Sequence, residues 1–540
     1  MAGLGTLIRL ILRRDRVKLP VWIVAIVASL LSMVPLLKET YGMGGELETM
    51  YQTFGANPAG LFLTGPMDSP TMAAFMTLET LLWWGLAIAF MNVLLVVRHT
   101  RQNEEMGAQE LLLSGHVHRT TNLVAVLLVA VATNTVLAVS IGAGMAAVGA
   151  GEWGAESAWL YGVAFGVFGV VWAAIAALVV QLFENTRSAT GMLASLIGVA
   201  FVVRGVGDFM GTKNADGLLE PAWVSSLSPF GWLQATRPLT FPDWWPLLIP
   251  LACAVVMIPV AMALQARRDV GAGLLPSRRG RAQATSFLQT PLGLTWYLQK
   301  NIFIGWLCAI VVMVLTIGVL VPEMSHIYES SESLKQMIEA MGGSGQMIPT
   351  FLSAMLSIIV LMVAAYVVQG LGRLRGEEFS GHLENLLALG ISRATWLALH
   401  TGVVLVGGLV MLVLTGWLLA LSVNLGTDFA IDTGSYILAA VSYWPLLLLF
   451  AGIYVLLFGL LPRAAGLVTW VYFGIVLFLS WLAPLLQLDQ WVMSISPLEY
   501  IAAAPAEDIE LMPLVYSSAV ALGLAVVGFA AWRNRNLLER

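Results

Sequence analysis

The sequence has little charge and almost no cysteine. Only 11% of its 540 residues are Asp, Glu, Lys or Arg, whereas a soluble globular domain carries about 25%. Its two cysteines, Cys253 and Cys308, both lie in apolar stretches, and no CxxC or other zinc-ligand spacing occurs. This composition argues against a disulfide-stabilised secreted domain and against a cysteine-ligated metal centre. The chain is 59% hydrophobic, so we expect lipid rather than water to surround most of it.

Signatures of nucleotide binding and of catalysis are also absent. No GxxxxGK[ST] motif occurs, and the glycine-rich stretch 342–345 lacks the lysine that would contact phosphate. The six histidines are scattered, so no Ser-His-Asp or Cys-His arrangement can be assembled. His116 and His118 have no carboxylate or cysteine at ligand spacing to complete a metal site. We therefore expect this chain to be no enzyme and to carry no cofactor or metal of its own.

Apolar runs long enough to cross a bilayer recur along the chain. A spanning helix needs about 20 predominantly apolar residues, and continuous runs without alternation favour helices over a membrane barrel. We predict spans at about 17–37, 71–97, 122–149, 157–182, 189–208, 245–265, 302–322, 349–371, 398–424, 435–461, 466–486 and 512–532. The expected fold is an all-α integral membrane protein with about 12 transmembrane helices.

Basic residues divide unevenly between the two faces of this predicted bundle. All but five of the 27 Lys and Arg fall on the face that carries both termini; the exceptions are Lys38, Arg204, Lys213, Arg237 and Lys335. Because cytoplasmic loops carry an excess of Lys and Arg, this face is expected to be cytoplasmic. We predict a multi-pass plasma-membrane protein with both termini inside. The net charge of −5 hides this division, and the acidic outer loops do not favour a nucleic-acid partner.

Three segments outside the spans have patterns of their own. Residues 1–16 place apolar side chains at helical spacing, which predicts an amphipathic helix in the membrane interface. The outer segments 209–244 and 487–511 combine Pro, Trp and apolar residues. Tryptophan is enriched at membrane–water boundaries, so these segments are expected to form either short helices dipping into the outer leaflet or interfacial loops.

One charged segment occurs twice, 274 residues apart and without a gap. The identical pairs are Arg101 and Arg375, Glu104 and Glu378, Gly107 and Gly381, Glu110 and Glu384, Leu112 and Leu386, Leu113 and Leu387, Arg119 and Arg393, and Thr121 and Thr395. A fixed offset of about half the chain indicates a duplicated and fused module. We predict two parallel six-span halves, 1–265 and 291–540, joined by a cytoplasmic linker at 266–290 that is rich in Gly, Pro and Arg.

The repeated segment lies between the second and third spans of each half. Glu104, Gly107 and Glu110 are spaced i, i+3, i+6, so one helix would bring them onto one face. Glycine costs about 1 kcal/mol in a helix interior, and its presence in both copies predicts close backbone approach. For a single copy, a solvated juxtamembrane helix would be the simpler interpretation. Two copies favour a docking surface.

The pattern E-x-x-G-x-x-E-x-L-L-x(5)-R, shared by both copies, resembles the coupling helix of ABC-2 type transporter permeases. The fused twelve-span arrangement is similar to the permeases of actinobacterial polyketide-antibiotic (tetronasin-type) exporters. The stretch 268–274 after the sixth span also resembles that group, as do the Ser-Pro segments at 228–229 and 496–497. The resemblance implies the permease subunit of an ATP-driven exporter of hydrophobic drugs, antibiotics or lipid-like compounds in a bacterial plasma membrane.

The same resemblance implies partners and site residues. Two copies of a separate ABC ATPase subunit would bind ATP and Mg²⁺ and would each receive one coupling helix. The implied ATPase-coupling residues are Glu104, Gly107, Glu110 and Arg119 in the first half, and Glu378, Gly381, Glu384 and Arg393 in the second. The first copy has Asn103 where the second has Glu377, so the two coupling helices are expected to bind unequally.

Polar and adaptable side chains inside the predicted spans give further candidates. Glu79 is ionisable at membrane depth, which makes it a functional candidate; it would contact a polar or cationic part of the substrate or hydrogen-bond a neighbouring helix. Met76 and Met362 would line an adaptable substrate path or pack in the core. Arg204 and Asp208, four residues apart, predict a local salt bridge.

Two other functions stay open. An ion-coupled secondary transporter can also join two six-span repeats, but it would need ionisable groups in several spans, where Glu79 is nearly alone. A membrane-embedded glycosyl or acyl transferase would need paired acidic or histidine residues at one membrane face, and no such pair recurs at a plausible position. The duplicated charged segment favours the ATP-driven exporter.

Overall fold

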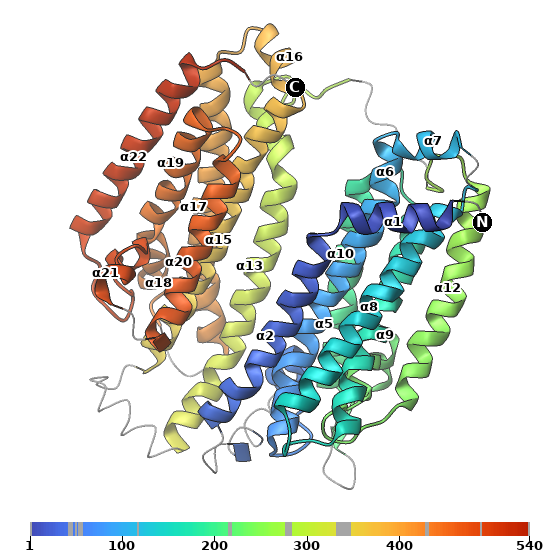
Figure 1. The fold of residues 1–540 in the computed structure, drawn as a ribbon. Helices are drawn as coiled ribbons and strands as arrows, with labels where there is room; N and C mark the ends of the chain where they lie inside the picture. The colour runs from blue at the N-terminus through green and yellow to red at the C-terminus, as the bar shows by residue number, and fades with distance from the viewer. Residues whose placement is uncertain are drawn as a thin grey trace. The chain divides into compact units, whose positions relative to one another are not determined.

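The computed structural model of this protein is helical along almost all of the residues that it describes (Figure 1). It describes the chain except for residues 1–2, 42–46, 49–50, 52–57, 116–117, 214–218, 276–282, 331–346, 427–430, 487–488 and 538–540. Within the described part, one two-stranded antiparallel sheet interrupts the helices, formed by β1 (Thr212–Lys213) and β2 (Leu219–Glu220). The predicted all-helical membrane fold is confirmed.

Eleven helices of the described part are long and apolar enough to cross a membrane. They are Lys18–Glu39, Met72–Glu105, Thr121–Val148, Ala155–Val179, Thr186–Phe209, Trp245–Arg267, Pro291–Leu315, Phe351–Phe379, Arg393–Leu425, Thr433–Leu460 and Leu511–Asn534. At the further predicted span, 466–486, the structure has the helix α20 (Ala465–Leu486), of which the described stretch Ala465–Ser480 counts as a shorter apolar helix. The described part of the chain therefore has eleven candidate spans and this shorter apolar helix.

The contacts divide the chain into two compact units, Met1–Gly280 and Arg281–Arg540. Each unit has its own large hydrophobic core. The boundary between the units falls inside the stretch 266–290, which the sequence analysis treats as a linker.

Unit 1 contains the elements α1 (Leu4–Arg14), α2 (Lys18–Tyr41), α4 (Pro58–Thr64), α5 (Met72–His99), α6 (Arg101–Glu105), α7 (Ala108–Leu113), α8 (Thr121–Val148), α9 (Ala155–Val179), α10 (Thr186–Phe209), β1, β2, η1 (Trp223–Leu227), α11 (Pro229–Ala235), η2 (Trp245–Leu247) and α12 (Leu248–Arg267). The predicted amphipathic helix at 1–16 forms as α1, which buries Leu7 and Ile11 and exposes Leu10 and Leu12. The outer segment before α12 contains the short helices η1 and α11.

Unit 2 contains α13 (Pro291–Ser330), α15 (Met347–Phe379), α16 (His382–Ala388), α17 (Arg393–Gly426), α18 (Thr433–Ser442), α19 (Trp444–Leu460), α20 (Ala465–Leu486), α21 (Gln490–Met493), η3 (Pro497–Tyr500) and α22 (Leu511–Asn534). Short helices, α21 and η3, again precede the last long helix. Both outer segments therefore contain short helices, which is one of the two structures expected for them.

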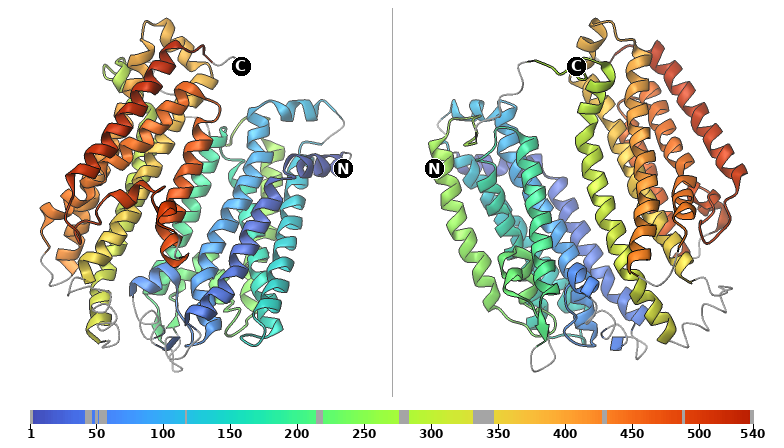
Figure 2. Two further views of the ribbon diagram at one scale, coloured as in Figure 1. Left: turned by 60° about the vertical axis from the view of Figure 1, so that its left-hand side comes forward. Right: turned by 180° about the vertical axis from the view of Figure 1, so that it is seen from behind.

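Small residues let the long helices approach closely within each unit. In unit 1, α8 and α9 lie side by side (Figures 1 and 2), and a Cβ on Gly162 would meet the backbone of Ala138 and Gly142. In unit 2, a Cβ on Gly528 of α22 would meet the backbone of α19 at Val455. Membrane helices associate through such small-residue contacts, because lipid supplies no hydrophobic drive between helices.

The predicted salt bridge near the end of α10 is confirmed. Arg204 Nη1 lies 3.1 Å from Asp208 Oδ2, and neither side chain is exposed (0% each). Asp208 also accepts hydrogen bonds from Ser225 and Gln234. The pair therefore fixes the end of α10 to η1 and α11.

Candidate functional site

The first copy of the repeated segment is not one continuous helix. α6 ends at Glu105, and Gly107 adopts a left-handed conformation with a φ of 72° before α7 begins. No atom of this chain lies within 4 Å of a Cβ built on Gly107, so no neighbouring segment of the chain makes the predicted close backbone approach there. The glycine is needed because the backbone turns through a region that other residues rarely adopt. The sequence predicts that one helix brings Glu104 and Glu110 onto the same face. The break at Gly107 instead places them on two separate helices, α6 and α7.

The second copy has the same break. α15 runs to Phe379, and Gly381 has a φ of 76° at the start of α16. Glu378 thus lies in the last turn of a long helix, while Glu384 lies on the short helix that follows. In both copies the turn separates a carboxylate before the glycine from a carboxylate after it.

The carboxylate before the turn in unit 1 is buried and paired within the chain. Arg268 donates to Glu104 through both guanidinium ends, with Nη2–Oε1 at 2.5 Å and Nη1–Oε2 at 2.9 Å. Arg101 Nη1 lies 2.8 Å from Glu104 Oε2, and the Glu104 side chain is only 4% exposed. Arg268 comes directly after α12, so this ion pair joins α6 to the end of the last span of unit 1.

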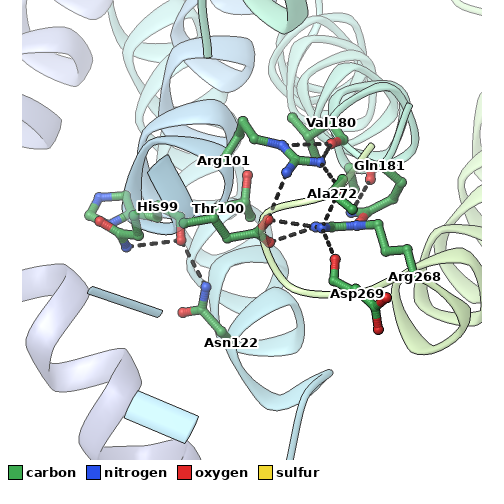
Figure 3. Close-up of polar contacts among 12 residues, drawn as sticks. His99, Thr100, Arg101, Asn122, Val180, Gln181, Arg268, Asp269 and Ala272 are labelled. Atoms are coloured by element: carbon green, nitrogen blue, oxygen red, sulfur yellow. Dashed lines mark hydrogen bonds and ion pairs between the residues drawn. The ribbon is translucent and has the colours of Figure 1, made fainter. Parts of the chain in front are cut away.

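The two arginines are themselves held by the end of α9. Arg268 Nε donates to Gln181 Oε1 at 2.7 Å, and Arg101 Nη2 donates to the carbonyl of Val180 at 2.8 Å. Figure 3 shows Arg101, Arg268 and Gln181 converging from three segments of unit 1, with the Ala272 carbonyl accepting from both guanidinium groups. Such charge-assisted and forked hydrogen bonds are about twice as strong as neutral ones.

Other residues of α6 reach further elements. Asn103 Oδ1 accepts from Arg14 Nη1 at 2.6 Å, at the end of α1. Glu105 Oε2 accepts from the backbone N–H of Thr186 at 3.1 Å, at the start of α10. Asn103, at the position where the second copy has Glu377, therefore connects α6 to α1. In the other copy Glu377 lies 3.2 Å from Arg373, so it too has a partner in its own unit.

Unit 2 contains a fork of the same kind. Arg535 Nη1 donates to Glu378 Oε1 at 2.8 Å, and its Nη2 donates to Oε2 at 2.6 Å. The Glu378 side chain is 1% exposed. Arg535 directly follows α22, and its guanidinium lies 4.5 Å from the centre of the Trp532 ring. Arg393 Nη1 donates to the Arg535 carbonyl at 2.6 Å, which brings another predicted coupling residue to this junction.

The carboxylates after the turns face outward. Glu110 and Glu384 are both exposed, and large apolar side chains near them in the sequence are exposed as well. These are Met106 (55%) and Leu111 (78%) in unit 1, and Phe379 (48%) and Leu389 (79%) in unit 2. Arg119 is also exposed, at the start of α8. Each unit thus presents an exposed carboxylate and uncovered apolar surface in the same segment. We call this surface the outer face of the unit, meaning that it points away from the unit's core; it is not part of the outer segments 209–244 and 487–511.

The apolar anchor predicted beside these glutamates points mostly inward. Leu112 packs against the core of unit 1, and Leu386 and Leu387 pack against the core of unit 2. These leucines fasten α7 and α16 to their units. Leu111 and Leu389, which the repeat does not match, supply the exposed apolar surface instead.

The intramembrane candidates lie apart from these segments. Glu79 is half-buried on α5, and none of the described residues hydrogen-bonds its carboxylate. The neighbouring Thr80 hydroxyl bonds Tyr161 of α9. Met76 is fully buried in the core of unit 1, and Met362 is half-buried against the core of unit 2. None of these three contacts the forked ion pairs.

The sequence alone does not identify the two forked arginines as partners of the repeated glutamates. Arg268 and Arg535 are 267 residues apart (535 − 268), whereas Glu104 and Glu378 are 274 apart (378 − 104). A gapless comparison therefore does not align the arginines. The available signal was position: each is an arginine that follows the last apolar run of its half.

Two comparisons place this chain among known proteins. A family model described as "Multidrug efflux system permease Rv1217c, C-terminal domain" matches residues 4–264 and 288–533. The multidrug efflux system permease protein Rv1217c of Mycobacterium tuberculosis (strain ATCC 25618 / H37Rv) is 30% identical over 533 residues, which cover 98% of this chain and 94% of that relative. The regions matched by the family model include α6, α7 and α16.

Proposed function

The chain belongs to the family of multidrug efflux system permeases, and from that premise we propose that separate ABC ATPase subunits drive it. It is a permease of a multidrug efflux system, a transport subunit and not an enzyme. The proposal adds that it is of the ABC-2 type, similar to the tetronasin-type antibiotic exporters. Two copies of an ATPase subunit would bind ATP and Mg²⁺ and contact the two outer faces.

The observation that supports ATPase docking is the composition of the outer faces. Exposed Leu111 and Leu389 are 78% and 79% accessible, in the same segments as the exposed carboxylates of Glu110 and Glu384. Central apolar contacts and charged groups with a complementary partner are what a protein interface uses for affinity and for orientation. Basic residues at the rim of an ATPase groove would pair with the two carboxylates.

The two outer faces differ, so we propose unequal docking. Unit 1 offers Met106 and Leu111, whereas unit 2 offers Phe379 and Leu389. These side chains occupy different places around their turns, although Glu110 and Glu384 correspond. An ATPase subunit would therefore bury a different apolar surface on each unit.

We also propose the orientation and the cargo. The ends of the chain and the outer faces would lie in the cytoplasm of a bacterium, as the distribution of Lys and Arg indicates. The two units would derive from one duplicated six-span module. The substrate would be a hydrophobic drug, antibiotic or lipid-like compound, for which Glu79, Met76 and Met362 are the path candidates.

The test uses the whole chain co-expressed with its ATPase subunits and reconstituted in liposomes. Replacing both exposed glutamates (Glu110→Ala with Glu384→Ala) is expected to reduce drug transport at least tenfold. The reason is that removing a charge from a paired contact can cost about 2–5 kcal/mol. Membrane insertion should be unchanged, because both side chains are exposed.

Glu499→Ala is the matched control, since Glu499 is also exposed but lies on η3, in one of the outer segments. Full transport by the double variant would refute the proposed docking. Transport that needs an ion gradient and no ATPase subunit would support the secondary-transporter alternative. A product covalently changed by the chain alone would support the transferase alternative.

A further inference from the structure

Each unit contains one feature that docking does not require. This feature is a buried glutamate just before the left-handed glycine. Its two carboxylate oxygens accept hydrogen bonds from the two Nη atoms of an arginine that directly follows the last span. In unit 1 the pair is Glu104 and Arg268, and in unit 2 it is Glu378 and Arg535. The glutamates are 4% and 1% exposed, so neither carboxylate is available to a partner subunit.

The surroundings of the two forks differ. In unit 1 the arginine is steadied by hydrogen bonds to Gln181 and the Ala272 carbonyl. In unit 2 it lies over aromatic rings, 4.5 Å from the centre of Trp532 and 5.2 Å from that of Phe458. The same forked pair is thus kept in two unlike environments. A shared mechanical requirement explains this better than shared packing does.

The position of the fork suggests that requirement. α7 is joined to α6 through Gly107, and α6 is bound by polar contacts to the ends of α9, α1, α12 and α10. Among these, the contact to the end of α12 is the forked ion pair. Two parallel hydrogen bonds fix orientation as well as distance, so a displacement of α6 would be passed to that end without rotation of the pair.

We propose that the forks are transmission links: Arg268 and Arg535 are positioning residues that make the last span of each unit move with the segment pushed by the ATPase. This inference rests on the proposed function and assigns a task to residues that do not touch the ATPase. The exposed glutamates receive the push, and the buried glutamates pass it to α12 and α22.

The experiment exchanges arginine for lysine, which keeps the charge and removes the fork. Arg268→Lys, Arg535→Lys and the double variant are reconstituted with the ATPase subunits, and drug transported per ATP hydrolysed is measured. ATPase binding by co-purification and the unfolding midpoint are measured on the same samples. Arg267→Lys and Arg533→Lys are matched controls, because each is an exposed arginine close to a fork.

The expected result is a fall of at least tenfold in transport per ATP in the double variant, with ATPase binding by the folded chain unchanged. The unfolding midpoint is expected to fall as well, because lysine cannot make the paired hydrogen bonds of the fork, so transport is compared per ATP hydrolysed by the folded fraction. Adding Glu104→Gln to Arg268→Lys should lower the ratio no further than Arg268→Lys alone, because both act through one pair. The controls should stay within twofold of the unaltered chain.

Three results would overturn the inference. Transport per ATP within twofold of normal in the double lysine variant would show that the forks carry no displacement. A fall that follows lost ATPase binding would make them part of docking. A lowered unfolding midpoint with an unchanged ratio in the folded fraction would make them structural. If the unaltered chain does not bind the ATPase subunits at all, the proposed function fails, and that result is distinct from these three.

Discussion

Replacing Asp208 by asparagine removes the counter-charge of a fully buried arginine. Arg204 is 0% exposed, and its guanidinium donates to Asp208 at 3.1 Å and to the Leu63 carbonyl at 3.1 Å. The guanidinium also donates to the Leu61 carbonyl at 3.4 Å, and it lies 4.6 Å from the centre of the Phe201 ring. Two carbonyl dipoles and an aromatic face do not neutralise a full charge. Removing one partner of a buried ion pair costs about 3–5 kcal/mol.

The remaining contacts of Asp208 add to that cost. Its carboxylate also accepts from Ser225 Oγ at 3.2 Å and from Gln234 Nε2 at 3.0 Å. The asparagine amide would place a donor where one of these donors points, and an unmade hydrogen bond costs about 1–3 kcal/mol. We therefore expect Asp208→Asn to lower the free energy of unfolding by about 4–6 kcal/mol. This range starts at the sum of the lower limits of the two costs, about 3 kcal/mol for the ion pair and about 1 kcal/mol for the hydrogen bond.

An apolar double replacement separates the charge from the packing. Arg204→Met with Asp208→Leu removes both charges, and such exchanges are often neutral or stabilising when volume is kept. This double variant should therefore be more stable than Asp208→Asn alone. The matched control is the exposed pair of Lys38 and Glu152, 3.4 Å apart with side chains 33% and 36% exposed. Glu152→Gln should cost about 0–1 kcal/mol.

The assay is denaturant unfolding of the purified chain in mixed micelles, followed by tryptophan fluorescence, with transport activity checked in the refolded sample. A loss for Asp208→Asn no larger than that for Glu152→Gln would refute the reasoning. So would a double variant less stable than the single one, because the buried charge would then not be the cause.

Three further predictions use the same unfolding assay. Gly107→Ala should cost about 1–2 kcal/mol, because a side chain disfavours the left-handed backbone there, and a change under 0.5 kcal/mol would argue against a rigid turn. Asn134→Leu should cost about 1–2 kcal/mol by removing the donor to Asn92 Oδ1, while Asn92 Nδ2 keeps its bond to the Ile88 carbonyl, and Asn92→Leu added to it should recover part of the loss. Burial raises the pKa of the Asp68 carboxyl above 3.8, and this outweighs the opposing charge of Arg237. The native state then holds that proton more tightly than the unfolded state does. The free energy of unfolding should therefore fall as the pH rises from 3.8 through the raised pKa. Asp68→Asn should remove this dependence of the free energy of unfolding on pH.

The helical membrane fold could be predicted because lipid imposes one simple rule on the sequence. Every spanning segment must be apolar for about 20 residues, and that signal survives without any knowledge of packing. The salt bridge between Arg204 and Asp208 was predictable for a similar reason, since a spacing of four residues on a helix fixes the distance. Both depend on short separations along the chain.

The site was harder to predict because its contacts are long-range. Arg268 lies 164 residues from Glu104 and Arg535 lies 157 from Glu378, and no local pattern specifies such a pairing. The left-handed turn at Gly107 was not predicted, because glycine serves two needs, close approach and left-handed turns, and sequence alone does not distinguish them. The two glutamates of each copy looked alike, yet the one before the glycine (Glu104 or Glu378) is buried and the one after it (Glu110 or Glu384) is exposed.

The central claim is that a separate ATPase drives this permease through its outer faces. The most direct measurement is drug transport by liposomes that contain the whole chain with or without its ATPase subunits, in the presence of ATP or of an ion gradient alone. The account predicts transport only when the ATPase subunits and ATP are both present. Transport by the chain alone, driven by the ion gradient without nucleotide, would contradict it.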